Sequence, residues 1–376
     1  MGDRLVLLGG GHAHVELVRQ LGDLAPGLSV TVVSPEENHY YSGMGPGMVG
    51  LRYRPEELCF PLRSLCGHAG VRFVKGEAER IDCTRRRVLL ISGESLTYDA
   101  LSCNVGSVVS CGGLKCGPSV VPVKPIRNLL VAGVRIERLL LVQPVALTVV
   151  GGGPAAFEIA GNLSRRLRLL SRHITEPTST HAERSSVTII PGRSPLRQFS
   201  RRARRLVERE LRRGGVRMGP RSYAVAASSS GVECEDGSSV ESDVTFLATG
   251  VRAPELFAKS GLPIGRAGEL LVDERLAAVR CDGVFGAGDC VQLQEGRLEK
   301  VGVYAVRETP ILLQNLLGYL NRGSPSTFAG TGRYMLLFNL GTDRGVFVRG
   351  RVSAAGRAAM ALKDRIDRTF AGRFRL

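Results

Sequence analysis

Two runs of hydrophobic residues, each ending in glycines, divide the chain into two similar halves. Leu5–Leu8 lead into Gly9-Gly10-Gly11, and Leu147–Val150 lead into Gly151-Gly152-Gly153. In both places a stretch with helical hydrophobic periodicity follows the glycines. This strand–turn–helix pattern is typical of a dinucleotide-binding site, because the glycine backbone can approach a pyrophosphate and the helix directs its N-terminal amides at the anion.

The pattern after the two loops also repeats, which indicates a duplicated unit. Gly70-Val71 matches Gly215-Val216, Tyr98-Asp99 matches Ser242-Asp243, and Gly106 matches Gly250, at spacings of 145, 144 and 144 residues. The alternation of apolar and polar positions predicts the remaining elements. These are strands over 4–8, 29–34 and 187–190; a meander of Val71–Glu77, Glu79–Cys83 and Val88–Ile91; a strand over 98–109; helices over 12–22, 125–140, 155–170 and 201–213; an exposed loop over 171–186; and a second meander over 216–250.

Beyond residue 250 the chain is expected to return to the first unit. Val284–Asp289 reads as an apolar strand ending in Gly-Asp, where the carboxylate can accept hydrogen bonds from the sugar-alcohol chain of a flavin, at the N-terminus of the next helix. Residues 334–353 read as a hairpin, and a basic helix is expected over 356–371. Leu362, Ile366 and Phe370 share one face of that helix, which either packs on the protein or lies on a membrane surface.

We therefore predict an α/β fold with two Rossmann-like dinucleotide-binding domains, each with a β-meander, and a small C-terminal α+β segment. The first domain is expected to comprise residues 1–122 and 246–325, and the second residues 123–245. Residues 326–376 supply the C-terminal hairpin and basic helix.

Composition and charge narrow the function classes. The N-terminus lacks the features of a secretory signal, and no apolar run reaches the roughly 18 residues of a membrane span. We expect a cytoplasmic protein, either free or peripheral on the inner face of the membrane. The net charge of +16 comes mostly from Arg, and it is either a solvated surface or an attraction to anionic lipid. Nucleic acid is not an expected partner, because the basic clusters lack interleaved aromatic residues and Trp is absent.

The nine cysteines are expected to be reduced thiols, because no export signal precedes them. No C-x-x-C pairs occur, so a structural zinc site is not expected. Cys111 and Cys116 are the only close pair, and they lie in the linker between the two units.

Three segments together carry a family resemblance. Gly9–Ala13, Ala248-Thr249-Gly250 and Gly286–Asp289 resemble the two-dinucleotide flavoproteins of the pyridine nucleotide–disulfide oxidoreductase superfamily. Within it the chain looks most like type II NADH dehydrogenases and sulfide–quinone reductases, and closest to the flavoprotein subfamily sometimes fused to selenophosphate synthetase. That last resemblance spans the chain and is carried by Gly9–Val15, Tyr41–Met44, Gly302–Arg307 and Lys363–Arg368.

The resemblance implies an FAD site in the first domain. Its residues would be Gly9, Gly11, His12 and Ala13 at the diphosphate, Asp289 at the ribityl chain, and Gly43, Gly106, Gly250, Gly288 and Val303 around the rest of the cofactor. His12 and His39 are the histidines expected to reach the cofactor. His14 replaces the third glycine of the loop, and Glu36 or Glu37 is the candidate for binding ribose.

The resemblance also implies a nicotinamide site, with NADPH or NADH held by Gly151, Gly153 and Ala156. Glu158 matches a Glu beside the nicotinamide of type II dehydrogenases; its alternative is an ordinary helix-surface residue. The second strand ends near Arg193 and Arg197, which suit a 2′-phosphate and hence NADPH. A degenerate site that binds no nicotinamide stays open.

The predicted reaction carries electrons from NAD(P)H through FAD to a quinone-type acceptor near Tyr304, Arg307 and the C-terminal segment. Glu158, Tyr304 and Arg307 are therefore the candidate catalytic residues. One alternative is a sulfide-, thiol- or selenium-handling flavoprotein that uses Cys111 and Cys116. The other is a flavin-binding redox sensor without catalysis, and homodimerisation is left open.

Overall fold

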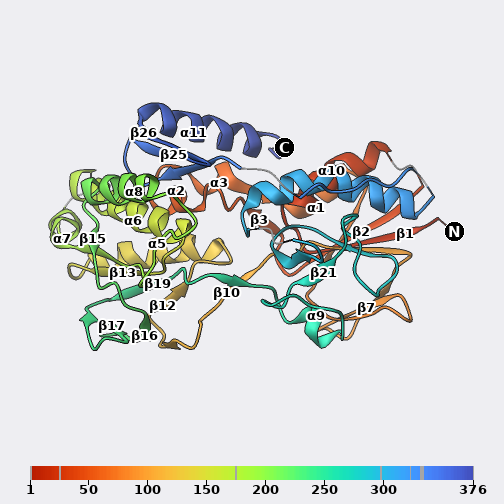
Figure 1. Ribbon diagram of the computed structural model, residues 1–376, viewed down its shortest axis with the longest axis horizontal. Helices are drawn as coiled ribbons and strands as arrows, with labels where there is room; N and C mark the ends of the chain where they lie inside the picture. Colours follow the sequence, from red (N-terminus) through yellow and green to blue (C-terminus); the bar gives the residue numbers. More distant parts are fainter. Residues whose placement is uncertain are drawn as a thin grey trace.

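The structure is a computed structural model that describes residues 2–24, 27–173, 176–296, 299–321, 323–330 and 334–375. Figure 1 shows two α/β units along the long axis of the molecule, with the N-terminus on the first. The C-terminal helix lies over the second unit and extends toward the first.

The first unit is built on a five-stranded parallel sheet. Its strand order is β22-β9-β1-β2-β5, with β1 Arg4–Leu8, β2 Ser29–Ser34, β5 Arg72–Lys75, β9 Ala100–Cys103 and β22 Val284–Gly286. Helices α1 (His12–Leu24) and α10 (Gly302–Tyr319) pack together beside it. Strands of such a sheet are buried on both faces, which is why Leu5–Leu8 of β1 form a continuous apolar run.

Smaller elements complete the first unit. They are the antiparallel strands β6 Ala78–Asp82, β7 Arg87–Leu90 and β8 Ser95–Thr97; the pairs β3 Asn38–Tyr40 with β4 Cys59–Pro61 and β21 Leu270–Val272 with β23 Val291–Leu293; and the helices α2 Gly45–Val49, α3 Pro55–Leu58, α4 Leu62–His68 and α9 Leu256–Lys259. The expected first meander strand, Val71–Glu77, is not part of the meander. Its central residues form β5, the edge of the parallel sheet, where Thr31 pairs with Arg72. The partner of a short strand is set by the tertiary fold, not by its own alternation.

The second unit repeats the arrangement with the strand order β12-β19-β13-β14-β15. Its strands are β12 Val120–Pro122, β13 Ala146–Val150, β14 Ser186–Ile190, β15 Arg217–Met218 and β19 Val244–Leu247; its long helices are α5 Arg127–Leu140, α6 Pro154–His173 and α8 Arg201–Arg213. A four-stranded sheet consists of β11 Lys115–Cys116, β16 Ala224–Ala227, β17 Val232–Cys234 and β18 Ser239–Val240. The duplicated α/β architecture is confirmed.

The exposed loop expected over 171–186 is wrong. Helix α6 extends to His173, and α7 (Thr178–Arg184) follows within that stretch. Ala182 is buried in the core of the second unit, and the His181 ring bonds the Leu140 carbonyl through Nδ1 at 2.8 Å. These long-range contacts stabilise a helix that the Ser/Thr-rich sequence does not indicate.

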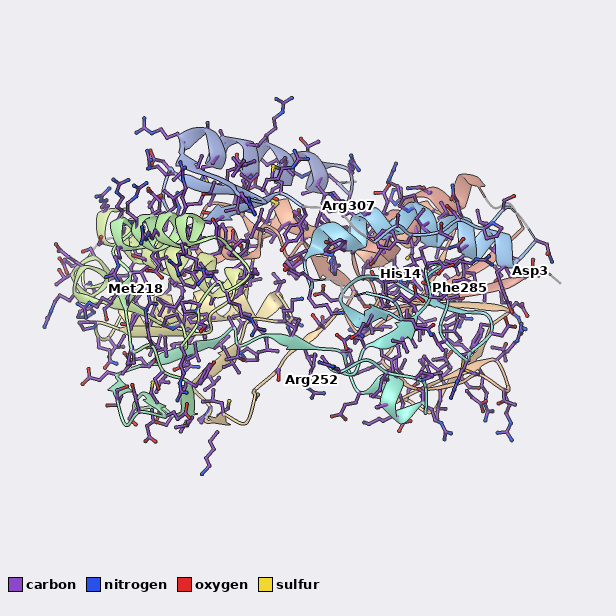
Figure 2. All side chains as sticks on the ribbon, in the orientation of Figure 1. Asp3, His14, Met218, Arg252, Phe285 and Arg307 are labelled. Carbon is purple, nitrogen blue, oxygen red and sulfur yellow. A yellow bond between two sulfur atoms is a disulfide. The ribbon has the colours of Figure 1, made fainter. Side chains whose placement is uncertain are left out.

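Two crossover segments join the units and pair with each other. Strand β10 (Val108–Val109) runs antiparallel to β20 (Val251–Arg252), and Figure 2 shows Arg252 at this crossing. The single strand expected over 98–109 is therefore two strands, separated by residues 104–107. Those four residues serve the site described below.

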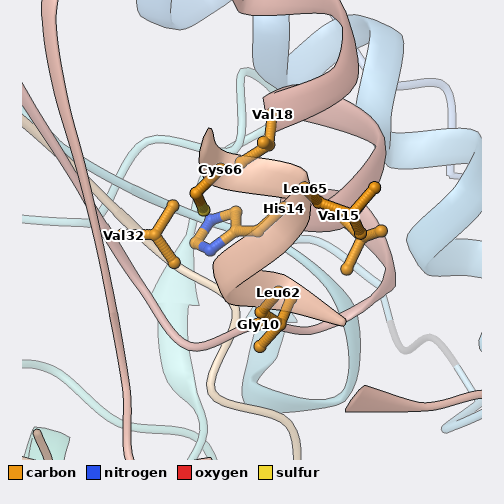
Figure 3. Close-up of a pocket in the computed structure, with 8 residues that line it drawn as sticks. All are labelled: Gly10, His14, Val15, Val18, Val32, Leu62, Leu65 and Cys66. Atoms are coloured by element: carbon orange, nitrogen blue, oxygen red, sulfur yellow. The ribbon is translucent and has the colours of Figure 1, made fainter. Parts of the chain in front are cut away.

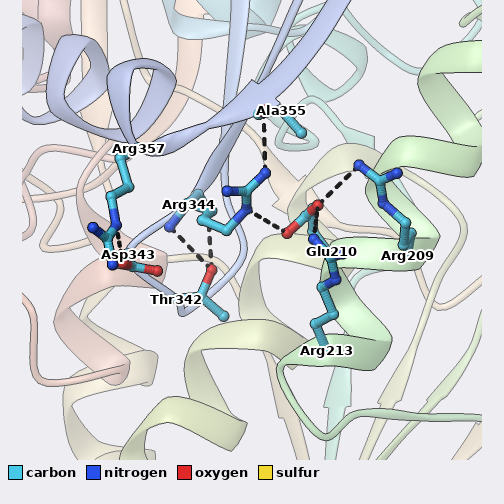
Figure 4. A network of polar contacts seen from close by, with 8 residues as sticks. All are labelled: Arg209, Glu210, Arg213, Thr342, Asp343, Arg344, Ala355 and Arg357. Carbon is cyan, nitrogen blue, oxygen red and sulfur yellow. Dashed lines mark hydrogen bonds and ion pairs between the residues drawn. The ribbon is translucent and has the colours of Figure 1, made fainter.

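The C-terminal segment is a three-stranded sheet with a helix. The expected hairpin is present as β24 (Leu336–Asn339) and β25 (Gly345–Arg349), and β26 (Val352–Gly356) adds a third strand before α11 (Arg357–Gly372). Figure 4 shows one anchor of this segment. The fully buried Glu210 of α8 accepts hydrogen bonds from Arg213 at 3.0 Å and from Arg344 at 3.1 Å, and Arg344 also donates to the Ala355 carbonyl. The second unit thus fixes the C-terminal sheet.

Helix α11 buries charged residues and exposes apolar ones, the reverse of an ordinary amphipathic helix. Its buried residues are Met360, Lys363, Asp367 and Ala371, whereas Leu362 and Ile366 are each 40% exposed. Of the predicted apolar stripe, Phe370 alone is partly buried and packs against the core. Two apolar positions therefore face outward while an ion pair lies inside.

The expectation of nine reduced thiols is also wrong. Cys83 and Cys281 form a disulfide, with their Cα atoms 5.9 Å apart. The two residues are 198 positions apart in sequence, and only the return of the chain to the first unit brings them together. Among the described residues no cluster of metal-ligating side chains occurs, and no helix is long and apolar enough to cross a bilayer.

Candidate active site

Both glycine loops adopt the backbone that the sequence pattern requires. Gly9 has φ +89° and Gly151 has φ +149°, in the region that disfavours L side chains. A Cβ at Gly9 would lie 2.5 Å from the Asn104 carbonyl oxygen, and one at Gly151 would lie 2.2 Å from the Ala248 carbonyl oxygen. Each loop is therefore pressed against the end of the neighbouring strand.

Asn104 was not singled out from the sequence, yet it organises the first loop. Its Oδ1 accepts hydrogen bonds from the backbone N–H groups of Ala13 at 3.1 Å and His14 at 3.4 Å, and its Nδ2 donates to the Ala287 carbonyl at 2.6 Å. The side chain thereby joins the start of α1 to the end of β22. Its position directly after the buried strand β9 was the available signal.

His14 now has a structural explanation. Its ring is buried, with Nδ1 2.7 Å from the Gly9 carbonyl oxygen and Nε2 2.8 Å from the Ser102 hydroxyl. Burial lowers the pKa of His14 to about 4, so the ring is neutral at pH 7. A histidine at the third glycine position thus ties α1 to the loop and to β9.

Figure 3 shows the small cavity beneath this loop, where α1 and α4 meet. Its lining is almost entirely apolar and leaves no room for a water molecule; the lining residues are Gly10, His14, Val15, Val18, Val32, Leu62, Leu65 and Cys66. We interpret it as a packing void of the first unit, separate from the candidate site.

Asp289 forms a polar cluster at the carboxyl end of the first sheet. Its Oδ2 accepts from Ser107 Oγ at 2.9 Å and from Lys124 Nζ at 2.5 Å. Burial opposes ionisation, but the Lys124 ammonium outweighs it and holds the pKa of Asp289 below its usual range. Lys124, which sequence reasoning missed, lies between β12 and α5 of the second unit. The next helix is not adjacent, because a short 3₁₀ turn and β23 intervene before α10.

Glu308 is a second carboxyl group beside this cluster that the sequence did not reveal. It lies on α10, and its Oε2 accepts the Gly288 N–H at 2.5 Å while Oε1 has no hydrogen-bond partner. Burial raises the pKa of Glu308 to about 7. This group therefore changes protonation near neutral pH.

The expected cofactor histidines contact each other. The rings of His12 and His39 lie edge to face with centroids 4.9 Å apart, and the Tyr41 ring is 5.2 Å from that of His12. Burial lowers the pKa of His12 to about 4 and that of His39 well below its usual value. Phe370 of α11 stacks on His12 at 6.1 Å, so the C-terminal helix reaches the first loop.

Glu158 is not an ordinary helix-surface residue. Its Oε1 accepts the Asn339 N–H at 2.8 Å and lies 4.0 Å from Lys363 Nζ, which in turn is 3.1 Å from Asp367 Oδ2. Burial raises the pKa of Glu158 and that of Asp367, although Lys363 opposes both shifts. The Lys363 ammonium thus forms ion pairs with two buried carboxyl groups, those of Glu158 and Asp367.

This cluster also contacts the loop of the first unit. Lys363 Nζ donates to the Gly43 carbonyl at 3.2 Å, and the Tyr41 hydroxyl donates to Asp367 Oδ1 at 3.3 Å. We call Tyr41, Glu158, Lys363 and Asp367 the buried charge cluster. It joins α6, α11 and the 41–43 loop, three segments far apart in sequence.

The end of the second unit's sheet carries a different cluster. Arg193 Nη2 lies 3.0 Å from Glu235 Oε2, and the guanidinium stacks over the Tyr223 ring at 5.5 Å. Arg197 is exposed. Glu235 and Tyr223 come from the second meander and its approach, and neither was anticipated.

The remaining predicted residues divide into two groups. Gly106, Gly153 and Gly250 face open space, because a Cβ at any of them would meet no atom within 4 Å, and Ala156 is buried at the start of α6. Tyr304 is buried with its ring 5.8 Å from that of Tyr334, whereas Arg307 is exposed near the start of α10 (Figure 2). Of these two predicted residues, Tyr304 therefore lies in the interior and Arg307 at the surface.

The acidic ribose candidates are both engaged with basic side chains. Glu36 accepts from Arg127 at 3.1 Å, and Glu37 accepts from Arg63 at 3.0 Å. Glu36 and Glu37 follow β2 at the carboxyl edge of the sheet, the edge at which such folds bind ligands.

Comparison with solved structures identifies the fold. The chain is similar over its full length to the sulfide:quinone oxidoreductase of Aquifex aeolicus, with a TM-score of 0.80, 19% identity and 92% of that chain covered. It is also similar over its full length to NDH2 of Plasmodium falciparum in complex with NADH, with a TM-score of 0.82, 13% identity and 97% of that chain covered. At these identities the likeness concerns the fold alone.

Sequence relatives cover less of the chain. An NADH dehydrogenase-like protein of Mycobacterium tuberculosis is 28% identical over 242 residues, which are 61% of this chain and 57% of that protein. The mitochondrial internal alternative NAD(P)H-ubiquinone oxidoreductase A1 of Arabidopsis thaliana is 29% identical over 155 residues, 41% of this chain. The alignments span 57% and 29% of the lengths of these curated relatives.

The family model for the pyridine nucleotide-disulphide oxidoreductases matches residues 3–308, a range that contains both glycine loops and the Gly-Asp strand end. The chain therefore belongs to the pyridine nucleotide-disulphide oxidoreductase family.

Proposed function

We propose that the protein is an FAD-dependent NAD(P)H dehydrogenase with a quinone-type acceptor. One observation carries this proposal: glycine loops with positive φ angles close two parallel sheets, and Lys124, which follows β12 of the second unit, joins Asp289 at the edge of the first. Two dinucleotides bound at such edges would meet between the units.

The first site fits FAD by the chemistry of its donors. The glycine loop at the start of α1 suits a diphosphate, and the Asp289 carboxylate suits the hydroxyls of a ribityl chain. The unpartnered His12 Nε2 is a buried polar atom that a cofactor oxygen or hydroxyl would satisfy. Gly43, Gly106, Gly250, Gly288 and Val303 are proposed to complete this site.

FAD bound there would accept a hydride from NAD(P)H and pass two electrons to the acceptor. The residues of the chain position the two cofactors and hold protons. Glu308, with its pKa of about 7, is placed to hold a proton beside Asp289. The buried charge cluster is proposed to lie beside the nicotinamide through Glu158, as the family resemblance implies.

Arg193 is proposed to bind the 2′-phosphate of NADPH. Its stacking on Tyr223 leaves the guanidinium edge for the phosphate, but Glu235 must release it first. Because a carboxylate that pairs with the arginine also repels phosphate, NADH use follows if this ion pair persists. A preference for NADPH would therefore indicate that Arg193 binds the 2′-phosphate, and a preference for NADH that it stays paired with Glu235.

The decisive experiment is anaerobic mixing of the purified yellow protein with NADH or NADPH while the visible flavin band is followed. Rapid bleaching is expected, and Arg193→Gln should reduce any advantage of NADPH at least several-fold in apparent affinity. Asp289→Ala should lower the flavin content of the purified protein, whereas Asp273→Ala, a turn residue on the first unit, should leave it unchanged. A flavin band that neither donor bleaches would contradict the proposal.

We also propose a peripheral contact with an anionic membrane surface. The exposed face of α8 carries Arg201, Arg202, Arg205, Arg209, Arg212 and Arg213. Leu362 and Ile366 of α11, together with Val352 at 65% exposure, lie in the C-terminal segment that packs on α8. Basic residues beside exposed apolar side chains are the combination that binds such surfaces.

A further inference from the structure

Cys111 and Cys116 differ from the other free cysteines of the described chain. Both are exposed, whereas Cys59 is half-buried and Cys66, Cys103, Cys234 and Cys290 are buried. They flank a tight turn in which the Leu114 N–H donates to the Cys111 carbonyl at 2.9 Å. Gly112 and Gly113, with φ +58° and +87°, form the turn, and this pair of left-handed residues is characteristic of a hairpin reversal.

The reversal brings Cys111 close enough to Cys116 to affect the pKa of Cys116. The Cys116 thiol donates to the Leu114 carbonyl at 3.5 Å, across the same turn that the Cys111 carbonyl closes. Partial burial, and then the nearby charge of Cys111, raise the pKa of Cys116. Because the Cys116 thiol is engaged with the Leu114 carbonyl, Cys111 is the sulfur available for the first attack.

Both ends of the turn are fixed to the rest of the molecule. On one side, Ser110 N–H donates to the Gly250 carbonyl at 3.0 Å, and Thr249 Oγ1 donates to the Ser110 carbonyl at 2.5 Å. On the other side, Lys115 and Cys116 form β11, which pairs with β16. The thiols are thus held as neighbours by the backbone, which lowers the entropic cost of joining them.

We propose that Cys111 and Cys116 form a thiol–disulfide exchange site for small-molecule disulfides. The Cys111 thiolate attacks one sulfur of the disulfide and releases the first thiol, leaving a mixed disulfide on Cys111. The Cys116 sulfur then attacks Cys111, releases the second thiol and closes a Cys111–Cys116 disulfide. The two cysteines lose two electrons and two protons, and the small disulfide gains both.

This site is separate from the proposed electron route. It does not include Asp289, Glu158 or either glycine loop, and it requires no nicotinamide for the exchange step. A positive or negative result for thiol–disulfide exchange therefore does not bear on the proposed NAD(P)H dehydrogenase activity, which the flavin experiment tests.

The test is incubation of the full-length protein with glutathione disulfide, followed by peptide mapping under non-reducing conditions. Peptide mapping is needed because the Cys83–Cys281 disulfide also contributes to the intact mass. A Cys111–Cys116 cross-linked peptide and two equivalents of released glutathione per protein are expected. Phenylarsine oxide, which binds paired thiols, should protect the pair at one equivalent.

Single substitutions make the order of attack visible. Cys116→Ser should accumulate a stable glutathione adduct on Cys111, because the resolving sulfur is absent. Cys111→Ser should react more slowly, because burial raises the pKa of the remaining Cys116 thiol and the thiolate is the nucleophile. Cys59→Ser is the matched control and should behave as the unmodified chain does. Stable adducts on both cysteines of the unmodified chain, or no reaction at either, would overturn the proposal.

Discussion

Single residues in this protein carry functions that their type does not suggest. His14 takes a glycine position and uses both ring nitrogens to hold α1 against the sheet. Lys363 lies inside the molecule between Glu158 and Asp367, although lysine is normally exposed. In both cases the side chain is explained by its partners, which come from other parts of the chain.

Replacing Lys363 by Met should destabilise the protein in a pH-dependent way. Without the ammonium, two buried carboxyl groups face each other, and breaking such an ion pair costs roughly 3–5 kcal/mol when the carboxylates are charged. Both carboxyl pKa values are already raised, so the folded state takes up protons as the pH falls, and the loss should shrink as the pH approaches these raised pKa values.

Thermal unfolding from pH 4.5 to pH 8 measures this effect. The deficit in Tm should be largest at pH 8 and smallest at pH 4.5. Arg365→Met, an exposed position on the same helix, is the control and should change Tm little at either pH. An equal deficit at all pH values would show that Lys363 acts through packing alone.

At the scale of elements, the first unit depends on segments that return to it late in the chain. Strand β22 joins the edge of its sheet, α10 packs on α1, and Cys281, just before β22, is bonded to Cys83 after β6. The disulfide therefore links the meander to the returning segment.

Removing that disulfide by the double change Cys83→Ser and Cys281→Ser should lower the unfolding free energy by about 2–4 kcal/mol, because it closes a long loop in the unfolded chain. Chemical denaturation measures the loss. Cys66→Ser serves as the control for the removal of a buried thiol that forms no disulfide. If the double variant is as stable as the unmodified protein, the bond does not contribute to the folded state in solution.

At the scale of the whole molecule, charge and exposed apolar groups gather around the C-terminal segment. The net charge of +16 includes the arginine face of α8, and α11 directs Leu362 and Ile366 outward. A surface of this composition is predicted to bind lipid through charge first and through apolar insertion second.

Co-sedimentation with vesicles tests this prediction. Binding should occur with anionic vesicles and be absent with zwitterionic ones. It should also weaken as salt is raised from 0.1 to 0.5 M, because the Debye screening length falls from about 10 Å to about half that value. Leu362→Asp should weaken binding several-fold. Ile91→Asp, exposed to 64% on the first unit, is the control. Equal binding to both vesicle types would contradict the charge-first interpretation.

The amino-acid sequence by itself determined the duplicated α/β architecture. The glycine loops, β1 and β2, and the helix over 201–213 lie where their local patterns predict them, because buried parallel strands are continuously apolar and glycine turns have few alternatives. The family follows from the same local signals. The cofactor and acceptor roles given to individual residues stay predictions.

Only the tertiary structure decided which distant side chains share a site. Asn104, Lys124, Glu235 and Glu308 meet the predicted residues through contacts that span tens to hundreds of positions, and the sequence marks none of these pairings. The same holds for α7, the Cys83–Cys281 disulfide and the inward face of α11. Local periodicity records the burial of each element, whereas ion pairs, disulfides and polar clusters depend on where the fold places two separate segments.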